Sequence, residues 1–115
     1  MCPDSDKSEI SEKLALLQER YFAQLPEKMA KIEAVWNKFD LQSTDQLSVL
    51  NELYRHVHNL MGSAGTFGAE QLSNAAKELQ QSIRTVLDNE NSISQEECDL
   101  IGRLISLVKK QSQMK

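Results

Sequence analysis

The sequence predicts an all-α fold, an antiparallel up-and-down bundle of four helices, and three observations predict it. Apolar residues recur at spacings of three and four in four successive segments. The 115 residues include only four glycines and two prolines and no run of β-branched residues, a composition that favours helices over strands. The connections between the segments are short, so consecutive helices are expected to run antiparallel.

The first helical pattern begins at Ser8, after a polar tail, residues 1–7, that we expect to be disordered. Pro26 interrupts the pattern. Because proline cannot donate a helical hydrogen bond, we expect a kink there, or an extra short N-terminal helix followed by a longer one. The apolar stripe of this region consists of Ile10, Leu14, Leu17, Tyr21, Leu25, Met29, Ile32, Trp36 and Phe39.

The second helix is expected to begin near Asp45, after a polar connection at residues 40–45. Ser43-Thr44-Asp45-Gln46 has the form of a capping box, in which side chains satisfy the free N–H groups of a helix start. The helix should end near Phe67, because Gly65 and Gly68 weaken it there. Its stripe consists of Leu50, Leu53, Val57, Leu60, Ala64 and Phe67.

The third helix is expected from about Ala69 to the polar run at residues 88–91, and a second capping box, Ser94-Gln95-Glu96-Glu97, should start the fourth. We assign residues 8–112 to the bundle and residues 113–115 to a C-terminal tail. The core is predicted to contain Leu50, Leu53, Val57, Leu60, Phe67, Leu72, Leu79, Ile83, Leu100 and Leu104.

Composition and charge exclude several functional classes. The formal net charge of −4 argues against a nucleic-acid partner. No apolar run approaches the ~18 residues of a membrane span, and the polar, acidic N-terminus does not resemble a signal peptide. Cys2 and Cys98 lie far apart and form no ligand motif, so we expect reduced thiols in a cytoplasmic protein. A monomer is expected.

Two histidines lie on the second helix, and the helical wheel separates them. His58 lies about 130° from the centre of the apolar stripe and should face solvent, whereas His56 lies about 70° away on the other flank, at the core boundary. Because the two are about 200° apart, they cannot bind one metal ion on a regular helix, and no metal site is expected.

Small residues surround the exposed histidine. Glycines at the fourth and seventh positions after His58 leave a patch with few side chains, which another protein can approach closely. The same glycines also suit close helix packing or a fraying helix end, and their spacing does not decide between these roles. The helical neighbours of His58 are Tyr54, Arg55, Met61, Gly62 and Gly65.

The segment His58-Asn59-Leu60-Met61-Gly62-Ser63-Ala64-Gly65, followed by Gly68 and Leu72, resembles the signature of histidine-containing phosphotransfer (HPt) domains, and Leu25-Pro26-Glu27 extends the similarity. The resemblance implies a phosphorelay intermediate of two-component signalling. In this role His58 accepts a phosphoryl group from a receiver-domain aspartate and passes it to another receiver. It implies no cofactor and no autonomous kinase activity, because the family places Mg²⁺ and a catalytic lysine on the receiver.

One position departs from the family's pattern. Met61 stands where HPt domains usually have a lysine that helps to hold the phosphoryl group. Arg55 on the second helix, and Lys77 and Arg84 on the third, are candidates to replace this cation, although Lys77 and Arg84 also fit an ordinary solvated face. Gln80 is expected beside the imidazole by resemblance. Two alternatives stay open: a pseudo-HPt domain that docks receivers with little phosphotransfer, and a helical adaptor in which His58 is incidental.

Overall fold

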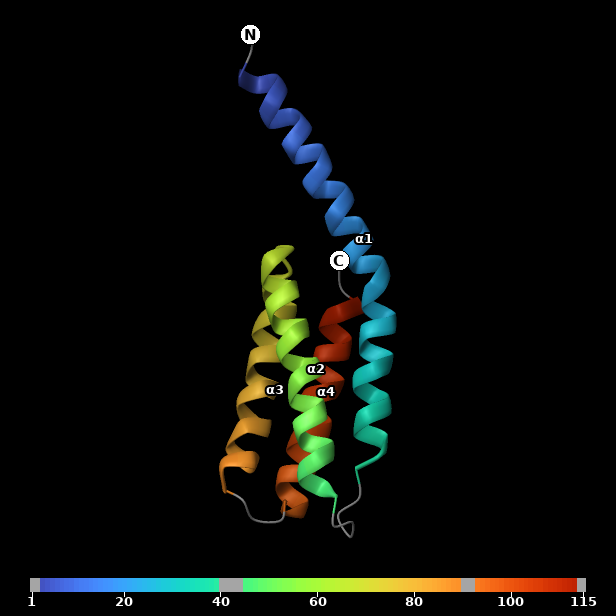
Figure 1. Ribbon diagram of the computed structural model, residues 1–115, viewed down its shortest axis with the longest axis vertical. Helices are drawn as coiled ribbons and strands as arrows, with labels where there is room; N and C mark the ends of the chain where they lie inside the picture. The colour runs from blue at the N-terminus through green and yellow to red at the C-terminus, as the bar shows by residue number, and fades with distance from the viewer. Residues whose placement is uncertain (1–2, 40–44, 90–92, 114–115) are drawn as a thin grey trace.

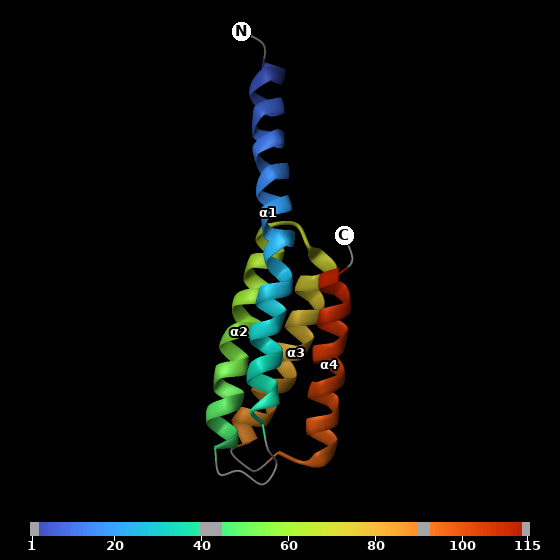
Figure 2. The ribbon, with the colours of Figure 1, turned by 90° about the vertical axis from the view of Figure 1, so that its right-hand side faces the viewer.

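The computed structural model describes residues 3–39, 45–89 and 93–113, with only the backbone of residues 3–10. Its elements are α1 (Pro3–Asn37), α2 (Gln46–Thr66), α3 (Glu70–Asn89) and α4 (Gln95–Gln113). Each helix packs against two others, α1 and α3 against both α2 and α4, and successive helices alternate in direction (Figures 1 and 2). The described residues contain no strand, and the predicted all-α four-helix bundle is confirmed.

The first helix is longer than predicted. It begins at Pro3, five residues before the expected start at Ser8. Proline is tolerated at a first helical position, where its missing N–H has no helical partner. The helix also continues through Pro26 as one element, and the expected extra N-terminal helix is absent. Buried Tyr21 and Leu25 on the N-terminal side of Pro26, and Met29 beyond it, hold the helix against the bundle.

The N-terminal part of α1 extends beyond the bundle and leans away from it (Figure 1). Within the predicted stripe, Tyr21, Leu25, Met29 and Ile32 are buried, and Trp36 and Phe39 are partly buried. Leu14 and Leu17 are 46% and 47% exposed, because no other helix reaches that far. At this end of the bundle, the side-chain amide of Gln18 donates to the Phe67 carbonyl at 2.9 Å. The side chain of Ile10 lies outside the described part.

The predicted ends of α2 and the predicted start of α4 agree with the structure. α2 begins at Gln46 and ends at Thr66, followed by Gly68 in the left-handed conformation at φ +79°. At the start of α4, the Glu97 N–H donates to Ser94 Oγ and the Ser94 N–H donates to the Glu97 carboxylate, both at 3.1 Å. This reciprocal pair confirms the second capping box. Residues 43–44 of the first capping box lie outside the described residues.

Eight of the ten predicted core residues are buried. Phe67 is only partly buried and stacks on Tyr21, with ring centroids 4.8 Å apart. The prediction that Leu100 belongs to the core is wrong, because its side chain is 42% exposed. The next residue, Ile101, is only 1% exposed. Successive helical residues point about 100° apart, and the buried stripe of α4 follows Ile101, Leu104, Ile105 and Val108.

Candidate functional site

The two histidines of α2 differ in exposure as predicted. His58 is exposed and His56 is half-buried, so the helical phase inferred from the apolar stripe is confirmed. His56 faces the α1 side, where it lines a hollow of about 270 Å³ with Lys28 and Lys31. His58 instead contacts residues of α2 and α3, and these contacts define the candidate site.

His58 forms a hydrogen bond with α3. Its Nδ1 lies 3.3 Å from Oε1 of Gln80, the residue that the family resemblance places beside the imidazole. An amide oxygen only accepts hydrogen bonds, so Nδ1 is the donor and carries the ring proton. In the neutral imidazole, Nε2 then holds a lone pair. Nε2 has no hydrogen-bond partner among the described residues, and it is available to a reactant from solvent.

Tyr54 completes a small cluster around this hydrogen bond. The Gln80 side-chain N–H donates to the Tyr54 hydroxyl at 3.2 Å, and the Tyr54 ring stacks near the imidazole with centroids 6.1 Å apart and planes 10° apart. The Arg84 guanidinium lies 5.9 Å from the centroid of the Tyr54 ring and pairs with Asp88 at 3.2 Å. We call Tyr54, His58, Gln80 and Arg84 the histidine cluster.

The predicted glycine clearance is present beside His58. A Cβ atom added at Gly62 would meet nothing within 4 Å, whereas one added at Gly65 would lie 3.5 Å from Ser73 Oγ. Gly62 therefore opens the surface next to the imidazole, and Gly65 lies closer to α3. Ser73 also donates to the Met61 carbonyl at 3.1 Å, which ties α3 to the turn of α2 that carries these small residues.

The three candidate cations differ in their contacts. Arg55 and Lys77 are exposed, and neither forms a hydrogen bond or ion pair within the described part of the chain. Arg84, the third candidate cation, joins the histidine cluster through the Tyr54 ring. Met61 is partly buried and packs against the core, and its thioether carries no charge.

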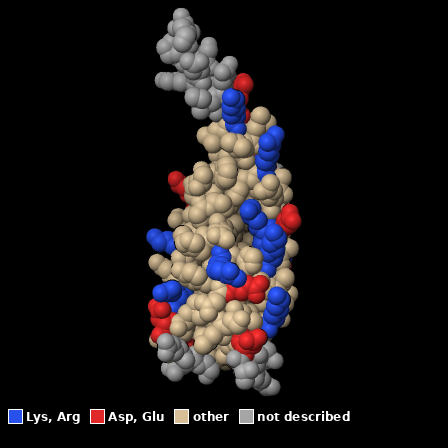
Figure 3. All heavy atoms as spheres, viewed as in Figure 1, with Lys and Arg blue, Asp and Glu red and all other residues tan. Residues whose placement is uncertain are grey.

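The face that carries α2 in front has both basic and acidic groups around an uncharged stretch of surface (Figure 3). Figure 3 shows Lys and Arg side chains over α1, over the middle of α2 and along the outer edge of α3. Arg55 belongs to α2, and Lys77 and Arg84 belong to α3. A phosphoryl group on His58 would bring about two negative charges to this face, and the surrounding cations would favour it.

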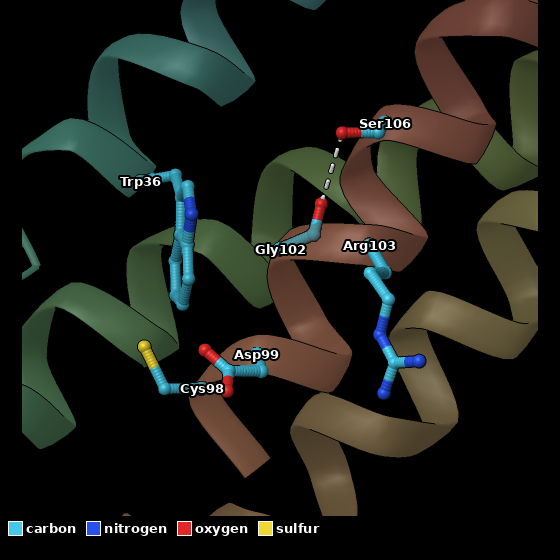
Figure 4. A pocket seen from close by; sticks show the side chains of 6 residues that line it. All are labelled: Trp36, Cys98, Asp99, Gly102, Arg103 and Ser106. Carbon is cyan, nitrogen blue, oxygen red and sulfur yellow. Dashed lines mark hydrogen bonds between the residues drawn. The ribbon is translucent and has the colours of Figure 1, made fainter. Parts of the chain in front are cut away.

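A separate hollow of about 620 Å³ lies between α1 and α4 (Figure 4). It is lined by Trp36, Cys98, Asp99, Gly102, Arg103 and Ser106, none of which belongs to the histidine cluster. Burial, together with the negative charge of Asp99, raises the pKa of the Cys98 thiol. A raised pKa keeps a thiol protonated and unreactive, so the Cys98 thiol is not an activated nucleophile.

On another flank of α2, the Tyr21 hydroxyl lies 2.8 Å from Ser63 Oγ. Burial raises the pKa of the Tyr21 phenol, and the hydrogen bond with Ser63 lowers it by less.

No group of three or more His, Cys, Asp or Glu residues suited to a metal ion occurs within the described ranges. None of the helices in those ranges is both long and apolar enough to cross a membrane.

The four-helix bundle thus presents an exposed, hydrogen-bonded imidazole on an open surface. The model of the Hpt domain family matches residues 16–111, and the chain belongs to this family. No curated protein and no solved structure matches the chain. Hpt domains are carriers of phosphoryl groups, and membership indicates a phosphorelay role in two-component signalling. Most of the part of α1 that extends beyond the bundle precedes the matched residues.

Proposed function

We propose that the chain accepts a phosphoryl group on Nε2 of His58 from an aspartyl phosphate of a receiver domain and passes it to a second receiver. The observation that supports this most is the hydrogen bond from Nδ1 to Gln80 Oε1. It fixes the proton on one ring nitrogen and leaves a lone pair on the other, at an exposed position of the helix. A nucleophile needs this lone pair.

The transfer step requires no reactant besides the imidazole and the aspartyl phosphate. The Nε2 lone pair attacks phosphorus while the bond between phosphorus and the aspartate oxygen breaks, and the aspartate leaves as a carboxylate with the electron pair. The ring keeps its Nδ1 proton and gains a positive charge, which strengthens donation to Gln80 Oε1. Phosphoryl transfer depends mainly on positioning and charge neutralisation, and attack by a receiver aspartate reverses the step.

The receiver is expected to dock on the α2–α3 surface around His58. This surface has the clearance that Gly62 leaves and the partly buried apolar group of Met61. Arg55 and Lys77 lie exposed on the same two helices, where they suit the acidic surroundings of an aspartyl phosphate. The full set of proposed contact residues is Tyr54, Arg55, Met61, Gly62, Gly65, Lys77 and Gln80.

The test is transfer of a radiolabelled phosphoryl group from a phosphorylated receiver domain to the chain. His58→Gln should abolish labelling and leave the helix content unchanged. The matched control is His56→Gln, which changes the same residue type two positions away and should be labelled like wild type. Labelling that survives in His58→Gln but is lost in His56→Gln would reject the assignment of the acceptor.

A second candidate is a pseudo-HPt domain that docks receivers but transfers slowly. Met61 favours it, because a partly buried apolar side chain stands where the family pattern has a lysine. Docking measured by titration calorimetry with an unphosphorylated receiver separates the two. Binding without labelling of His58 supports the pseudo-HPt domain. Labelling within the lifetime of the receiver phosphate supports the relay. Neither binding nor labelling would leave a plain helical adaptor.

A further inference from the structure

We propose that a hollow between α1 and α2 binds an anion that carries a phosphate group, either inorganic phosphate or a small phosphate ester. The hollow has a volume of about 270 Å³. It is lined by Lys28 and Lys31 of α1 and by His56, Asn59 and Leu60 of α2, and we call it the α1–α2 hollow. Its lining shares no residue with the histidine cluster, so the proposal does not rest on phosphoryl transfer by His58.

The lining of the α1–α2 hollow contains basic groups and no acidic group. Two ammonium groups and an imidazole come together there from two helices, although the whole chain has a formal net charge of −4. Basic side chains lie over α1 in Figure 3. The positive charge of the hollow is therefore not neutralised by the residues that line it.

The acidic side chains close to the hollow in sequence do not neutralise it either. Glu52, one turn before His56 on α2, is paired with Lys38 at 3.9 Å. Glu27, one turn before Lys31 on α1, is exposed and forms no ion pair within the described residues. Lys28 and Lys31 likewise form no ion pair in that part of the chain, and their charges are available to an anion from solvent.

The groups around the hollow are partly fixed before any ligand binds. Lys28 is half-buried, and its Nζ lies 5.9 Å from the centroid of the Tyr21 ring, whose face attracts a cation. His56 is also half-buried, and Leu60, which is 2% exposed, contributes an apolar wall. Side chains that are already held in place lose less entropy when a ligand binds.

The donors and the size of the hollow favour a small ligand with a phosphate group. A phosphate monoester carries nearly two negative charges and three acceptor oxygens, whereas a carboxylate carries one charge. Two ammonium groups can balance the dianion, and the imidazole and the Asn59 amide are further donors to its oxygens. Pockets for drug-sized ligands measure about 300–1,000 Å³, so this hollow suits a small phosphate ester better than a nucleotide.

The test is nitrogen–proton NMR of the chain during a titration with sodium phosphate, with sodium chloride adjusted to keep the ionic strength constant. At about pH 7.5 phosphate is mostly a dianion. The amide signals of the residues that line the hollow should shift and reach saturation. A second titration with glycerol 3-phosphate distinguishes the two sources of the ligand: saturation with both probes indicates a site for phosphate esters, and saturation with inorganic phosphate alone indicates a site for the free ion.

Variants of the lining separate charge from shape. Lys28→Gln and Lys31→Gln should each weaken phosphate binding at least about threefold, and the double variant should not reach saturation. Lys28→Arg keeps the charge and should keep the affinity within about twofold. Asn59→Asp keeps the shape but adds a negative charge, so it should weaken binding at least about threefold.

The matched control is Lys13→Gln, which also removes one lysine charge from α1. Lys13 lies fifteen residues before Lys28, about 22 Å along the helix, and salt at about 0.1 M screens charges beyond about 10 Å. Phosphate affinity should stay at the wild-type value in this control. Lys13 and Lys31 are exposed and Lys28 is half-buried, so the helix content should be unchanged in all the lysine variants.

Several outcomes would overturn the proposal. Shifts that grow linearly without saturation would mean that phosphate only screens the surface, and the hollow would be left to an acidic side chain of a partner protein. Equal losses of affinity in Lys13→Gln and Lys28→Gln, wild-type affinity in the double variant or in Asn59→Asp, or a loss in Lys28→Arg as large as in Lys28→Gln would also reject the site.

The outcome for the α1–α2 hollow is distinguishable from the outcome for His58. Saturable phosphate binding by a chain that a receiver never labels would support the hollow while rejecting the proposed function. Normal labelling of His58 without saturable phosphate binding would do the reverse.

Discussion

Gly62 should lower the stability of the bundle while permitting the receiver to approach. Glycine inside a helix costs about 1 kcal/mol relative to alanine, and a Cβ atom at this position meets nothing within 4 Å. Gly62→Ala should therefore raise the free energy of unfolding by about 1 kcal/mol and the Tm by about 4 °C. Urea denaturation followed by circular dichroism measures the change.

A longer side chain at the same position should separate stability from function. Gln is also a better helix former than glycine, so Gly62→Gln should be at least as stable as wild type. Its side chain would lie one turn from His58 and keep the phosphorus from reaching attack distance. Because displacements of about 1 Å can cost on the order of a hundredfold in rate, we expect a loss of that order in single-turnover transfer from a labelled receiver.

Gly68→Ala is the matched comparison among the glycines near the site. Gly68 has φ +79°, and a Cβ there would lie 3.2 Å from the Gln18 side-chain nitrogen. This change should lower the free energy of unfolding by about 1–2 kcal/mol. Transfer at the wild-type rate in folded Gly62→Gln would mean that the receiver does not need the room that Gly62 leaves. Destabilisation of Gly62→Ala as large as that of Gly68→Ala would mean that the space around Gly62 is not open.

Three further changes test the core, the charge at the site and the buried phenol. Leu60 is 2% exposed, so Leu60→Ala should lower the free energy of unfolding by about 2–5 kcal/mol in urea denaturation; a loss well below this would mean a poorly packed site. Met61→Lys should speed transfer to His58 a few-fold, about 0.5–1 kcal/mol, with an advantage that fades in salt; slower transfer at low and high salt would instead indicate that Met61 makes an apolar contact with its receiver. The raised pKa of Tyr21 means that the folded state holds this proton more tightly than the unfolded state, whose phenol titrates near the ordinary value of 10.0. Stability should thus fall as the pH rises above about 10, and less steeply in Tyr21→Phe; equal slopes between about pH 9 and 11 would contradict this.

Features that depend on a single helix could be predicted from the sequence. The apolar stripe of α2 set the orientation of both histidines, because exposure follows directly from the angle around the helix axis. The capping box at Ser94 was likewise a local pattern, and its two hydrogen bonds formed as predicted. The predicted burial of Leu14 and of Leu100 was wrong for different reasons. Leu14 continues a regular stripe beyond the end of the bundle, and Leu100 adjoins Ile101, which takes the buried place.

The site itself depends on how α2 and α3 are aligned along each other, and a single sequence does not determine this alignment. Gln80 was expected beside His58 only through the family resemblance. The bond between Gln80 and Tyr54, and the place of Arg84 on the tyrosine ring, required the three-dimensional structure. Arg55 and Lys77 were reasonable candidates by helical spacing, but long exposed side chains gain little from any one contact and are not fixed by their position in the sequence.

The central claim is that Nε2 of His58 carries the phosphoryl group. The most direct test is phosphorus and nitrogen NMR of the chain after transfer from a phosphorylated receiver, under alkaline conditions that preserve phosphohistidine. We predict a single phosphorylated imidazole, that of His58, with the phosphoryl group on Nε2 and the proton on Nδ1. Phosphate on His56, phosphate on Nδ1 of His58, or an unmodified His58 after complete discharge of a cognate receiver would contradict the account.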